Sequence, residues 1–316
     1  MNTRIKGTGS SLPQKVLTND DLAKLVDTND EWISSRTGIK RRRISNGETS
    51  SQLGAQAALK ALENAGVESD QVDLIIVATS SPDYAFPSTA ACVQSIIGAS
   101  NAACFDMSVA CTGFVFALST ADAFIRAGVY KTVLVIGAEV MSSEIDWSDR
   151  SVCVLFGDGA GAAVLQAEDV SQMVSDIHSD GSRGLCLTSN AIQINKDEPA
   201  VKNIVMNGRE VFKFAVKQVP ESINEVLKKA NADKSDIKYY VLHQANERII
   251  ESVAKRLGES IEKFPMNIEN YGNTSAASVP ILLDELNRSG MLKTGDKIIL
   301  SGFGGGLSWG SIYLEW

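Results

Sequence analysis

Short runs of apolar, largely β-branched residues alternate along the chain with segments of helical periodicity. Continuous apolar strands that are separated by helices are typical of a buried sheet in an α/β protein. The stretch 168–205 has little periodicity and predicts loops, whereas the ending SIYLEW predicts a strand. The other predicted strands cover 72–79, 104–109, 131–139, 161–166, 238–242 and 297–303.

The two halves of the chain repeat these features in the same order. Val72 of SDQVDLIIVAT matches Ile237 of KSDIKYYVLH at an offset of 165, and VLVIG matches IILSG at the same offset. Chance similarity between α/β segments is the alternative interpretation. The repeat predicts a duplicated α/β unit, which we divide into the halves 1–167 and 168–316.

Charge and cysteine content narrow the function classes. The chain has 30 Lys and Arg against 38 Asp and Glu, a formal charge of −8, which argues against a general nucleic-acid binder. Any anionic ligand must therefore meet a local basic patch. The five cysteines contain no CxxC pair and predict neither a disulfide framework nor a zinc site. No signal peptide and no apolar run of ~18 residues is present, so we expect a cytoplasmic protein that does not bind membranes.

Cys111 and Asn273 occupy similar turns in the two halves. Gly128 and Gly290 define a local offset of 162, and this offset carries Cys111 onto Asn273. In both turns small residues precede a predicted helix. A helix N-terminus would stabilise a thiolate at Cys111 and favour its attack on a carbonyl group. The alternative is an inert core cysteine, which is also our interpretation of Cys92, Cys104, Cys153 and Cys186.

The chain contains two histidines and two glycine-rich segments, and one of each is a candidate for catalysis. His243 ends the apolar strand YYVL, where α/β proteins place catalytic groups, although a structural histidine is the alternative. His178 lies in an irregular segment and is expected to be structural. SGFGGGLSWG follows a strand without opening a helix, so it predicts a turn whose N–H groups could hold an oxyanion. FGDGAGAAV (156–164) predicts a hairpin turn.

Four motifs occur one after another along the chain: VACTGF around Cys111, VLHQAN around His243, YGNTSAAS around Asn273 and FGGGLSWG around Gly305. Together they closely resemble β-ketoacyl-acyl carrier protein synthase III, the initiating condensing enzyme of dissociated bacterial fatty acid synthesis in the thiolase superfamily. The resemblance runs from GTGSSLP near the start to WGSIYLEW at the end.

This resemblance implies a thiolase-like fold of two βαβαβαββ halves in a layered αβαβα arrangement, in a homodimer. Cys111 would be acylated by a primer acyl-CoA, with the N–H groups of Cys111 and Gly305 holding the oxyanion. His243 and Asn273 would then stabilise the enolate that forms when malonyl-acyl carrier protein loses carbon dioxide. The resemblance implies no metal and no cofactor, since the CoA thioester is a substrate.

Two absences distinguish the chain from other members of the superfamily. Elongating synthases use two histidines with their cysteine, whereas this chain has Asn273 at the second position. Biosynthetic thiolases need a second cysteine near the C-terminus, and this sequence has none after Cys186. The resemblance therefore favours the Cys-His-Asn class with a decarboxylative condensation.

The resemblance also implies how CoA and the primer are bound. Trp32 and Arg150 would sandwich the adenine, because a flat base stacks well between an indole and a guanidinium group. The remaining CoA contacts would be Thr28, Arg36, Gly208 and Asn246. The acyl pocket would include Phe86, Leu155, Phe156 and Met206. Phe86 would come from the partner subunit, with an ordinary interface aromatic as the alternative. For the basic run 40–43, the alternative to a CoA contact is a solvated basic surface.

An acidic carrier protein needs a basic landing site on this acidic chain. The residues that match the docking positions of the family are Lys213, Arg248, Lys255 and Arg256. Solvated helix charge is the alternative interpretation. Arg248 and Lys255 are seven residues apart, which places both on one helix face.

Three function classes remain at this point. The first is the condensing enzyme, and the second is a related acyltransferase or a condensing enzyme of specialised metabolism with a different acceptor. The third is a non-catalytic binding protein, which the presence of Cys111, His243 and Asn273 disfavours. Primer preference turns on about a methylene or two, worth only ~1–3 kcal/mol, and the sequence does not rank the primers.

Overall fold

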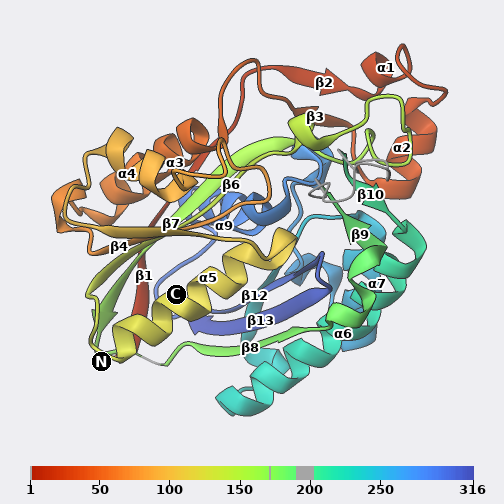
Figure 1. Ribbon diagram of the computed structural model, residues 1–316. Helices are drawn as coiled ribbons and strands as arrows, with labels where there is room; N and C mark the ends of the chain where they lie inside the picture. Colours follow the sequence, from red (N-terminus) through yellow and green to blue (C-terminus); the bar gives the residue numbers. More distant parts are fainter. Residues whose placement is uncertain (1, 171, 190–202) are drawn as a thin grey trace.

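Two mixed sheets form the framework of the computed structural model, which describes residues 2–170, 172–189 and 203–316 (Figure 1). In the first sheet, β4 pairs in parallel with β5 and β6, whereas β7 pairs antiparallel with β6 and β1. The order across this sheet is β1 (Asn2–Ser11), β7 (Asp158–Glu168), β6 (Thr132–Val140), β4 (Leu74–Ala78) and β5 (Ala103–Met107).

The second sheet repeats the pairing pattern of the first. β11 pairs in parallel with β12, and β13 pairs antiparallel with both β12 and β8. Its order is β11 (Ile237–Leu242), β12 (Lys297–Gly304), β13 (Ser308–Glu315) and β8 (Val174–Ser179). The duplicated α/β architecture that the repeat predicted is thereby confirmed. The boundary at 167/168 stays a prediction.

Helices and sheets alternate in five layers. The middle layer contains α5 (Gly113–Arg126) and α9 (Ser278–Arg288), whose buried residues join apolar side chains of both sheets in one core. The outer face of the first sheet is covered by α3 (Ser50–Ala65) and α4 (Thr89–Ile97). The outer face of the second is covered by α6 (Gly208–Ala230) and α7 (Glu247–Leu257). This is the predicted αβαβα order.

Local sequence explains where α3 begins and ends. The Thr49 side chain accepts a hydrogen bond from the N–H of Gln52, and the Gln52 side chain accepts one from the N–H of Thr49, which makes a capping box. Gly66 ends the helix at φ 66°, a left-handed conformation that glycine adopts without a steric penalty. The alanine-rich buried side of α3 then packs on the first sheet.

Short elements complete the fold around one end of the sheets. A fourth core cluster joins several of them, including Leu22, Ile33, Val152 and Phe156. The short helices and strands are β2 (Val16–Thr18), α1 (Asn19–Leu22), α2 (Asp30–Thr37), β3 (Arg41–Arg43), β9 (Leu187–Thr188), β10 (Val205–Met206) and α8 (Ile268–Tyr271). The 3-10 turns are η1 (Ser69–Gln71), η2 (Ala110–Thr112), η3 (Met141–Glu144), η4 (Gly181–Cys186), η5 (Lys234–Asp236), η6 (Ile261–Lys263) and η7 (Ser275–Ala277).

Arg42 corrects the interpretation of the basic run 40–43 as a solvated surface. Its side chain is completely buried. The guanidinium group donates to the Asn19 side chain at 2.9 Å and to the carbonyl oxygens of Leu17 and Val154 at 3.3 and 2.7 Å. Burial lowers the pKa of Arg42 to about 10. This arginine therefore ties β2 and β3 to the segment that leads to Phe156.

The predicted strands all occur, with shifted ends, but two predictions from local pattern are wrong and one strand was missed. Part of the presumed loop 168–205 forms β8, and 190–202 lie outside the described residues. FGDGAGAAV is not a hairpin turn, since most of it lies inside β7. Its glycines allow α9 to approach, because a Cβ on Gly161 would lie 2.7 Å from the backbone of Ile281. The sequence pattern also missed β1.

In the described residues, no helix combines the length and apolar character that crossing a membrane requires.

Candidate active site

Cys111 lies in the turn η2, directly before α5, and is 7% exposed. The preceding residue, Ala110, has a positive φ of 43°, an uncommon conformation for alanine. Gly304 approaches so closely that a Cβ there would lie 2.8 Å from the Cβ of Cys111. The turn therefore needs a glycine on the neighbouring strand β12 in order to hold the cysteine where it is.

His243 follows β11 and is 1% exposed. Its backbone N–H donates to the carbonyl oxygen of Ser301 on the adjacent strand β12 at 2.8 Å. The ring lies edge-on to Phe303 with centroids 5.0 Å apart, and Nδ1 lies 2.6 Å from Ser278 Oγ. Nε2 is buried and has no hydrogen-bond partner in the described part of the protein. Burial lowers the pKa of His243 to about 3, so the ring is neutral.

Hydrogen bonds of its backbone and of its side chain hold Asn273 in place. Its N–H donates to Leu155 O at 2.9 Å, and its carbonyl oxygen accepts from the N–H of Gly157 at 3.0 Å. Oδ1 accepts from the N–H of Ser275 at 2.9 Å. Since the oxygen is occupied in this way, the amide nitrogen is the end of Asn273 that is available as a donor.

The structure corrects the register in which Cys111 and Asn273 were matched. Ala110 and Ser275 are the two non-glycine residues with positive φ in these turns, at 43° and 49°, and they are 165 positions apart. The helices that follow begin at Gly113 and Ser278, again 165 apart. The counterpart of Cys111 is therefore Ala276, and Asn273 comes from the loop that enters the turn.

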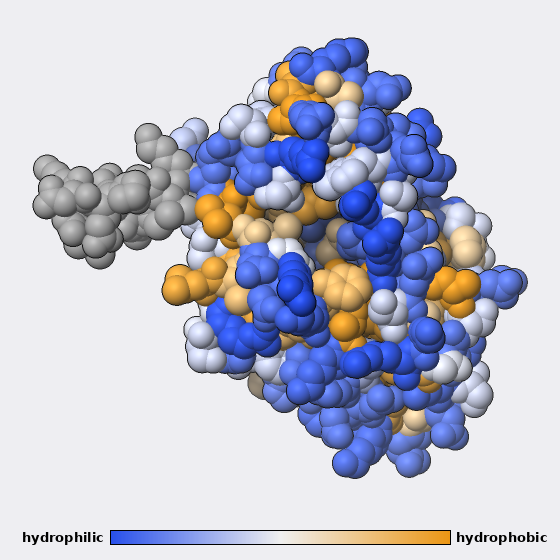
Figure 2. Space-filling view, turned by 90° about the vertical axis from the view of Figure 1, so that its right-hand side faces the viewer, coloured by the Kyte–Doolittle hydropathy of each residue, from blue (hydrophilic) through white to orange (hydrophobic). Residues whose placement is uncertain are grey.

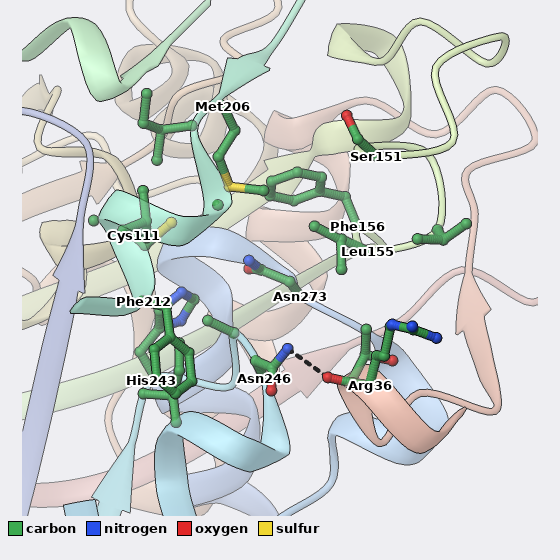
Figure 3. A pocket seen from close by; sticks show the side chains of 18 of the residues that line it. Arg36, Cys111, Ser151, Leu155, Phe156, Met206, Phe212, His243, Asn246 and Asn273 are labelled. Carbon is green, nitrogen blue, oxygen red and sulfur yellow. Dashed lines mark hydrogen bonds between the residues drawn. The ribbon is translucent and has the colours of Figure 1, made fainter. Parts of the chain in front are cut away.

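One cavity of about 230 Å³ collects Cys111, His243 and Asn273 (Figure 3). Each comes from a different turn, and Figure 3 shows the three side chains converging. A second cavity, of about 590 Å³, is also lined by Cys111. Cys111, Phe156 and Leu187 line both cavities.

Burial decides the protonation of Cys111. The pKa of the thiol is raised to about 12: burial is the largest cause and the buried Glu139 adds to it, while hydrogen bonds from Ser275 and from the Cys111 backbone oppose the rise. The helix N-terminus was expected to favour the thiolate. The cost of burying the charge is larger than this effect, so the thiol form is favoured.

Several residues that were predicted to bind CoA lie along the first cavity, toward its mouth. Trp32, Arg36, Gly208 and Asn246 line the cavity, and the Asn246 side chain donates to Arg36 O at 3.0 Å. Figure 2 shows the face of the molecule that contains α2 and α7, with a hollow bordered by hydrophobic and hydrophilic residues near its centre. Leu155, Phe156 and Met206 also line this cavity, whereas Gly305 lines the second one.

The predicted adenine sandwich is closed in this structure. The guanidinium groups of Arg36 and Arg150 each lie 4.7 Å from the Trp32 ring, so Arg150 already covers the indole. Arg150 also donates to the backbone carbonyl oxygen of Asp27 at 2.5 Å. Thr28 Oγ1 is buried without a hydrogen-bond partner among the described residues.

Seven of the predicted site residues do not line either cavity, and two of them are Thr28 and Arg150. Phe86 is 86% exposed and lies away from the cavities of its own chain. The other four are the predicted docking residues on α6 and α7, which are Lys213, Arg248, Lys255 and Arg256. His178 also lies apart. It binds Asp176 at 3.0 Å and stacks on Trp309, a structural setting.

Among the described residues, there is no group of three or more His, Cys, Asp or Glu side chains that could hold a metal ion.

Comparisons with known proteins identify the family. The family model "3-Oxoacyl-[acyl-carrier-protein (ACP)] synthase III" matches residues 105–181, and its C-terminal counterpart matches 227–316. The β-ketoacyl-[acyl-carrier-protein] synthase III of Clostridium acetobutylicum is 54% identical over 321 residues, which is 100% of this chain and 99% of the relative. The chain belongs to the 3-oxoacyl-[acyl-carrier-protein] synthase III family.

Solved structures agree with this assignment. The synthase III from Aquifex aeolicus superposes with a TM-score of 0.94 at 46% identity, covering 99% of this chain and 100% of that one. The synthase III from Pseudomonas aeruginosa gives 0.94 at 40% identity, covering 100% and 98%. The thiolase-like fold is thereby confirmed. The chain is an acyltransferase of the synthase III family, a condensing enzyme for the initiation of fatty acid synthesis, and the alternative in specialised metabolism is not favoured.

Sequence reasoning missed several residues that contact the candidate catalytic side chains of this synthase III. Ser278 contacts His243, Phe303 packs on its ring, and Ser275 contacts both Cys111 and Glu139. Glu139 is completely buried and accepts hydrogen bonds from Ser81 and its neighbours. Ser275 and Ser278 stand inside the motif YGNTSAAS, but nothing in the pattern says which serine faces which candidate catalytic group.

Proposed function

We propose that Cys111, His243 and Asn273 perform the decarboxylative condensation of a primer acyl-CoA with malonyl-acyl carrier protein. The observation that carries the proposal is the convergence of a thiol, a neutral imidazole and an amide in one buried cavity. A thiol supplies the nucleophile, and two neutral donors suit a carbonyl oxygen on which negative charge develops. The products are CoA, carbon dioxide and 3-ketoacyl-acyl carrier protein.

In the first half-reaction, the Cys111 sulfur attacks the thioester carbonyl carbon of the acyl-CoA. The bond from this carbon to the CoA sulfur breaks, and the thiol proton leaves with CoA. Backbone N–H groups of Cys111 and Gly305 are the proposed oxyanion donors. Gly305 lies in the turn between β12 and β13, and a Cβ there would lie 3.3 Å from the Cβ of Ala110, which brings this backbone close to η2.

In the second half-reaction, His243 and Asn273 donate hydrogen bonds to the thioester carbonyl oxygen of the malonyl group. Loss of carbon dioxide leaves an enolate, whose carbon attacks the acyl carbonyl on Cys111. The Cys111 sulfur departs as a thiolate and takes up a proton. A single oxyanion donor of this kind is worth about 10²–10³ in kcat, so two donors can drive decarboxylation without a metal or an organic cofactor.

We assign the first cavity to the pantetheine arm and the second to the primer chain. Trp32, Arg36 and Asn246 stand near the mouth of the first cavity, where the nucleotide of CoA would lie. Insertion of the adenine then requires Arg150 to move off the Trp32 ring, after which Thr28 Oγ1 can pair with the nucleotide. Leu155 and Met206 would accordingly contact the arm, whereas Phe156, which lines both cavities, would contact the primer.

The carrier protein is expected to dock on α6 and α7. Arg248 and Arg256 are exposed, and each donates to a backbone carbonyl oxygen, that of Ser35 and that of Val216. These bonds hold the two guanidinium groups in place on the surface of α7. Lys213 is paired with Glu210 at 2.8 Å, and Lys255 is exposed. A local basic surface of this kind would attract an acidic carrier to a chain of net charge −8.

A homodimer is supported by the edge of the first sheet. β5 is the last strand of this sheet, and the described strands leave its outer edge unpaired. Nearby Tyr84, Phe86 and Ile96 are 60%, 86% and 52% exposed, an apolar surface that pairing of two copies would cover. Phe86 would then reach the partner subunit. A cytoplasmic location stays a prediction from the sequence.

Intact-protein mass spectrometry tests the assignment. The wild type, Cys111→Ala, His243→Ala and Asn273→Ala are incubated with a panel of acyl-CoAs and then with malonyl-acyl carrier protein. We expect an acyl adduct on every protein except Cys111→Ala, and its transfer into a 3-ketoacyl carrier only in the wild type.

Acylation of Cys111→Ala would refute the nucleophile. Condensation at the wild-type rate in His243→Ala or Asn273→Ala would refute the donor role of that residue. The acyl-CoAs that form adducts identify the primer class.

A further inference from the structure

Ser278 stands directly behind the imidazole of His243. It is the first residue of α9 and is 2% exposed. Its Oγ lies 2.6 Å from His243 Nδ1 and 3.3 Å from the backbone nitrogen of Gln244. In the described part of the chain, these are the two hydrogen-bond partners of the hydroxyl. Because all three groups are buried, their hydrogen-bond donors and acceptors must pair with one another.

The donors and acceptors around Ser278 Oγ allow one arrangement in which every hydrogen atom at that point has an acceptor. The N–H of Gln244 can only donate, so Ser278 Oγ accepts from it. If His243 Nδ1 also carried a proton, two donors would point at Oγ and the hydroxyl hydrogen would have no acceptor. Leaving a buried hydrogen unpaired costs about 1–3 kcal/mol. The hydroxyl of Ser278 therefore donates to Nδ1, which acts as the acceptor.

This arrangement fixes the position of the remaining ring proton. A neutral imidazole carries one N–H, and with Nδ1 as the acceptor that proton is on Nε2. Nε2 is the buried nitrogen without a partner among the described residues, on a residue that lines the cavity with Cys111 and Asn273. The lowered pKa of His243 agrees with a ring that stays neutral.

We propose that Ser278 is a positioning residue that holds His243 in the Nε2–H tautomer, so that the ring donates rather than accepts at the substrate carbonyl. This inference rests on the proposed donor role of His243 in the decarboxylation. The wrong tautomer would present a lone pair to the carbonyl oxygen and would repel the developing enolate. Acyl transfer from acyl-CoA to Cys111 does not use this donor.

The chain is well suited to a direct test because it contains only two histidines, His178 and His243. Nitrogen-15 NMR of ¹⁵N-histidine-labelled protein, with His178→Asn for assignment, reads the tautomer of the resting enzyme. We expect a protonated Nε2 and an unprotonated Nδ1 for His243 in the wild type. A protonated Nδ1 would overturn the proposal without any activity measurement.

The variants Ser278→Ala and Ser278→Thr then test the role of the hydroxyl. We expect Ser278→Ala to show a mixture of tautomers and to lose about 10–100-fold in malonyl decarboxylation, the range found for outer partners of histidine ligands. Its rate of Cys111 acylation should stay within about threefold of wild type, and Ser278→Thr, which keeps the hydroxyl, should recover the single tautomer. Unchanged tautomer and decarboxylation in Ser278→Ala would overturn the proposal.

Ser311→Ala provides a matched control. Ser311 is also completely buried, and its hydroxyl donates to Ser301 Oγ at 3.0 Å without touching His243. This variant should lose stability but keep the tautomer and the ratio of the two half-reactions. If His243→Ala still decarboxylates at the wild-type rate, the proposed function of His243 fails, whereas the NMR result still decides whether Ser278 sets the tautomer.

Discussion

Single residues acquire their chemistry here from burial. His243 is an ordinary histidine in sequence, but the cavity wall removes water from its ring and lowers its pKa to about 3. The same desolvation raises the pKa of the Cys111 thiol to about 12. Both groups are therefore neutral at rest, which keeps uncompensated charge out of the cavity that they line.

Burial of His243 makes the folded protein sensitive to acid. The unfolded chain binds a proton at the ordinary pKa of 6.5, whereas the folded chain does so only near 3. The contribution of the neutral His243 ring to the free energy of unfolding is thus complete above pH 6.5. It falls by about 1.4 kcal/mol per pH unit as the pH drops from 6.5 toward 3. Between pH 7.5 and 5.0, we expect His243→Asn to lose about 2 kcal/mol less stability than the wild type.

Urea denaturation at the two pH values measures this difference. Since His178 is present in both proteins, its titration cancels. Equal losses of unfolding free energy in wild type and variant would contradict the expected burial of a neutral ring.

Gly304 controls the position of Cys111, the proposed nucleophile. An alanine Cβ at this position would lie 2.8 Å from Cys111 Cβ and 3.0 Å from the Cys111 nitrogen, so η2 must shift. Displacement of a reacting atom by about 1 Å can cost about 10²-fold in rate. We expect Gly304→Ala to slow acylation of Cys111 by about this factor, as followed by intact mass.

Gly181→Ala is the control for this change, because nothing lies within 4 Å of its added Cβ. It should acylate at the wild-type rate. Equal rates for Gly304→Ala and Gly181→Ala would show that the close approach at Gly304 does not position the thiol.

Elements in this protein are set by how closely their backbones approach. α3 lies against β1 because Gly7 and Gly9 have no side chains to hold it away. A Cβ on Gly9 would lie 2.3 Å from Ala57 O and 2.4 Å from Ala61 N, which are backbone atoms of α3 that cannot rotate aside. The N-terminal strand is thereby locked to the outer helix layer of the first half.

We expect Gly9→Ala to lose about 3 kcal/mol of unfolding free energy in urea titrations, the upper end of ordinary overpacking. Gly54→Ala in α3 itself is the comparison. Its Cβ would meet side chains and no backbone, those of Ala138 and Val93 at 3.3 Å and of Ile136 at 3.6 Å, and alanine gains up to about 1 kcal/mol in helix propensity. Its net change should be close to zero. A loss as large as that of Gly9→Ala would contradict the backbone-clash explanation.

At the scale of the whole molecule, the middle layer joins the two halves. α9 comes from the second half, yet Asp284 accepts hydrogen bonds from Thr8 and Ser10 of the first half at 2.9 and 2.5 Å. Leu282 and Leu283 of α9 share a core with Phe114 and Leu118 of α5. Neither half can bury this layer without the other, so the site between them depends on both.

The shared layer predicts a single cooperative unfolding transition. Tryptophans report on both halves, with Trp32 and Trp147 in one and Trp309 and Trp316 in the other. Fluorescence and far-ultraviolet circular dichroism should therefore give coincident denaturation curves. Asp284→Ala should move both curves together to lower denaturant concentration. Two separated transitions would contradict the prediction.

The sequence by itself determined the family, the duplicated α/β architecture and most strands, because hydrophobic period and motif order are local properties of the chain. It also singled out Cys111, His243 and Asn273 as candidates. It misplaced elements whose identity depends on distant partners. β1 and β8 are strands because β7 and β13 pair with them. Arg42 is buried because carbonyl oxygens far along the chain accept hydrogen bonds from its guanidinium group.

Only the tertiary structure decided how the active-site atoms are arranged and charged. The register of the two turns, the pairing of Ser278 with His243 and the closed stack of Arg150 on Trp32 join residues far apart in the chain. The protonation of Cys111 and His243 depends on how completely the fold excludes water. Distances and desolvation are properties of the folded chain, because they arise only when separate segments pack against one another.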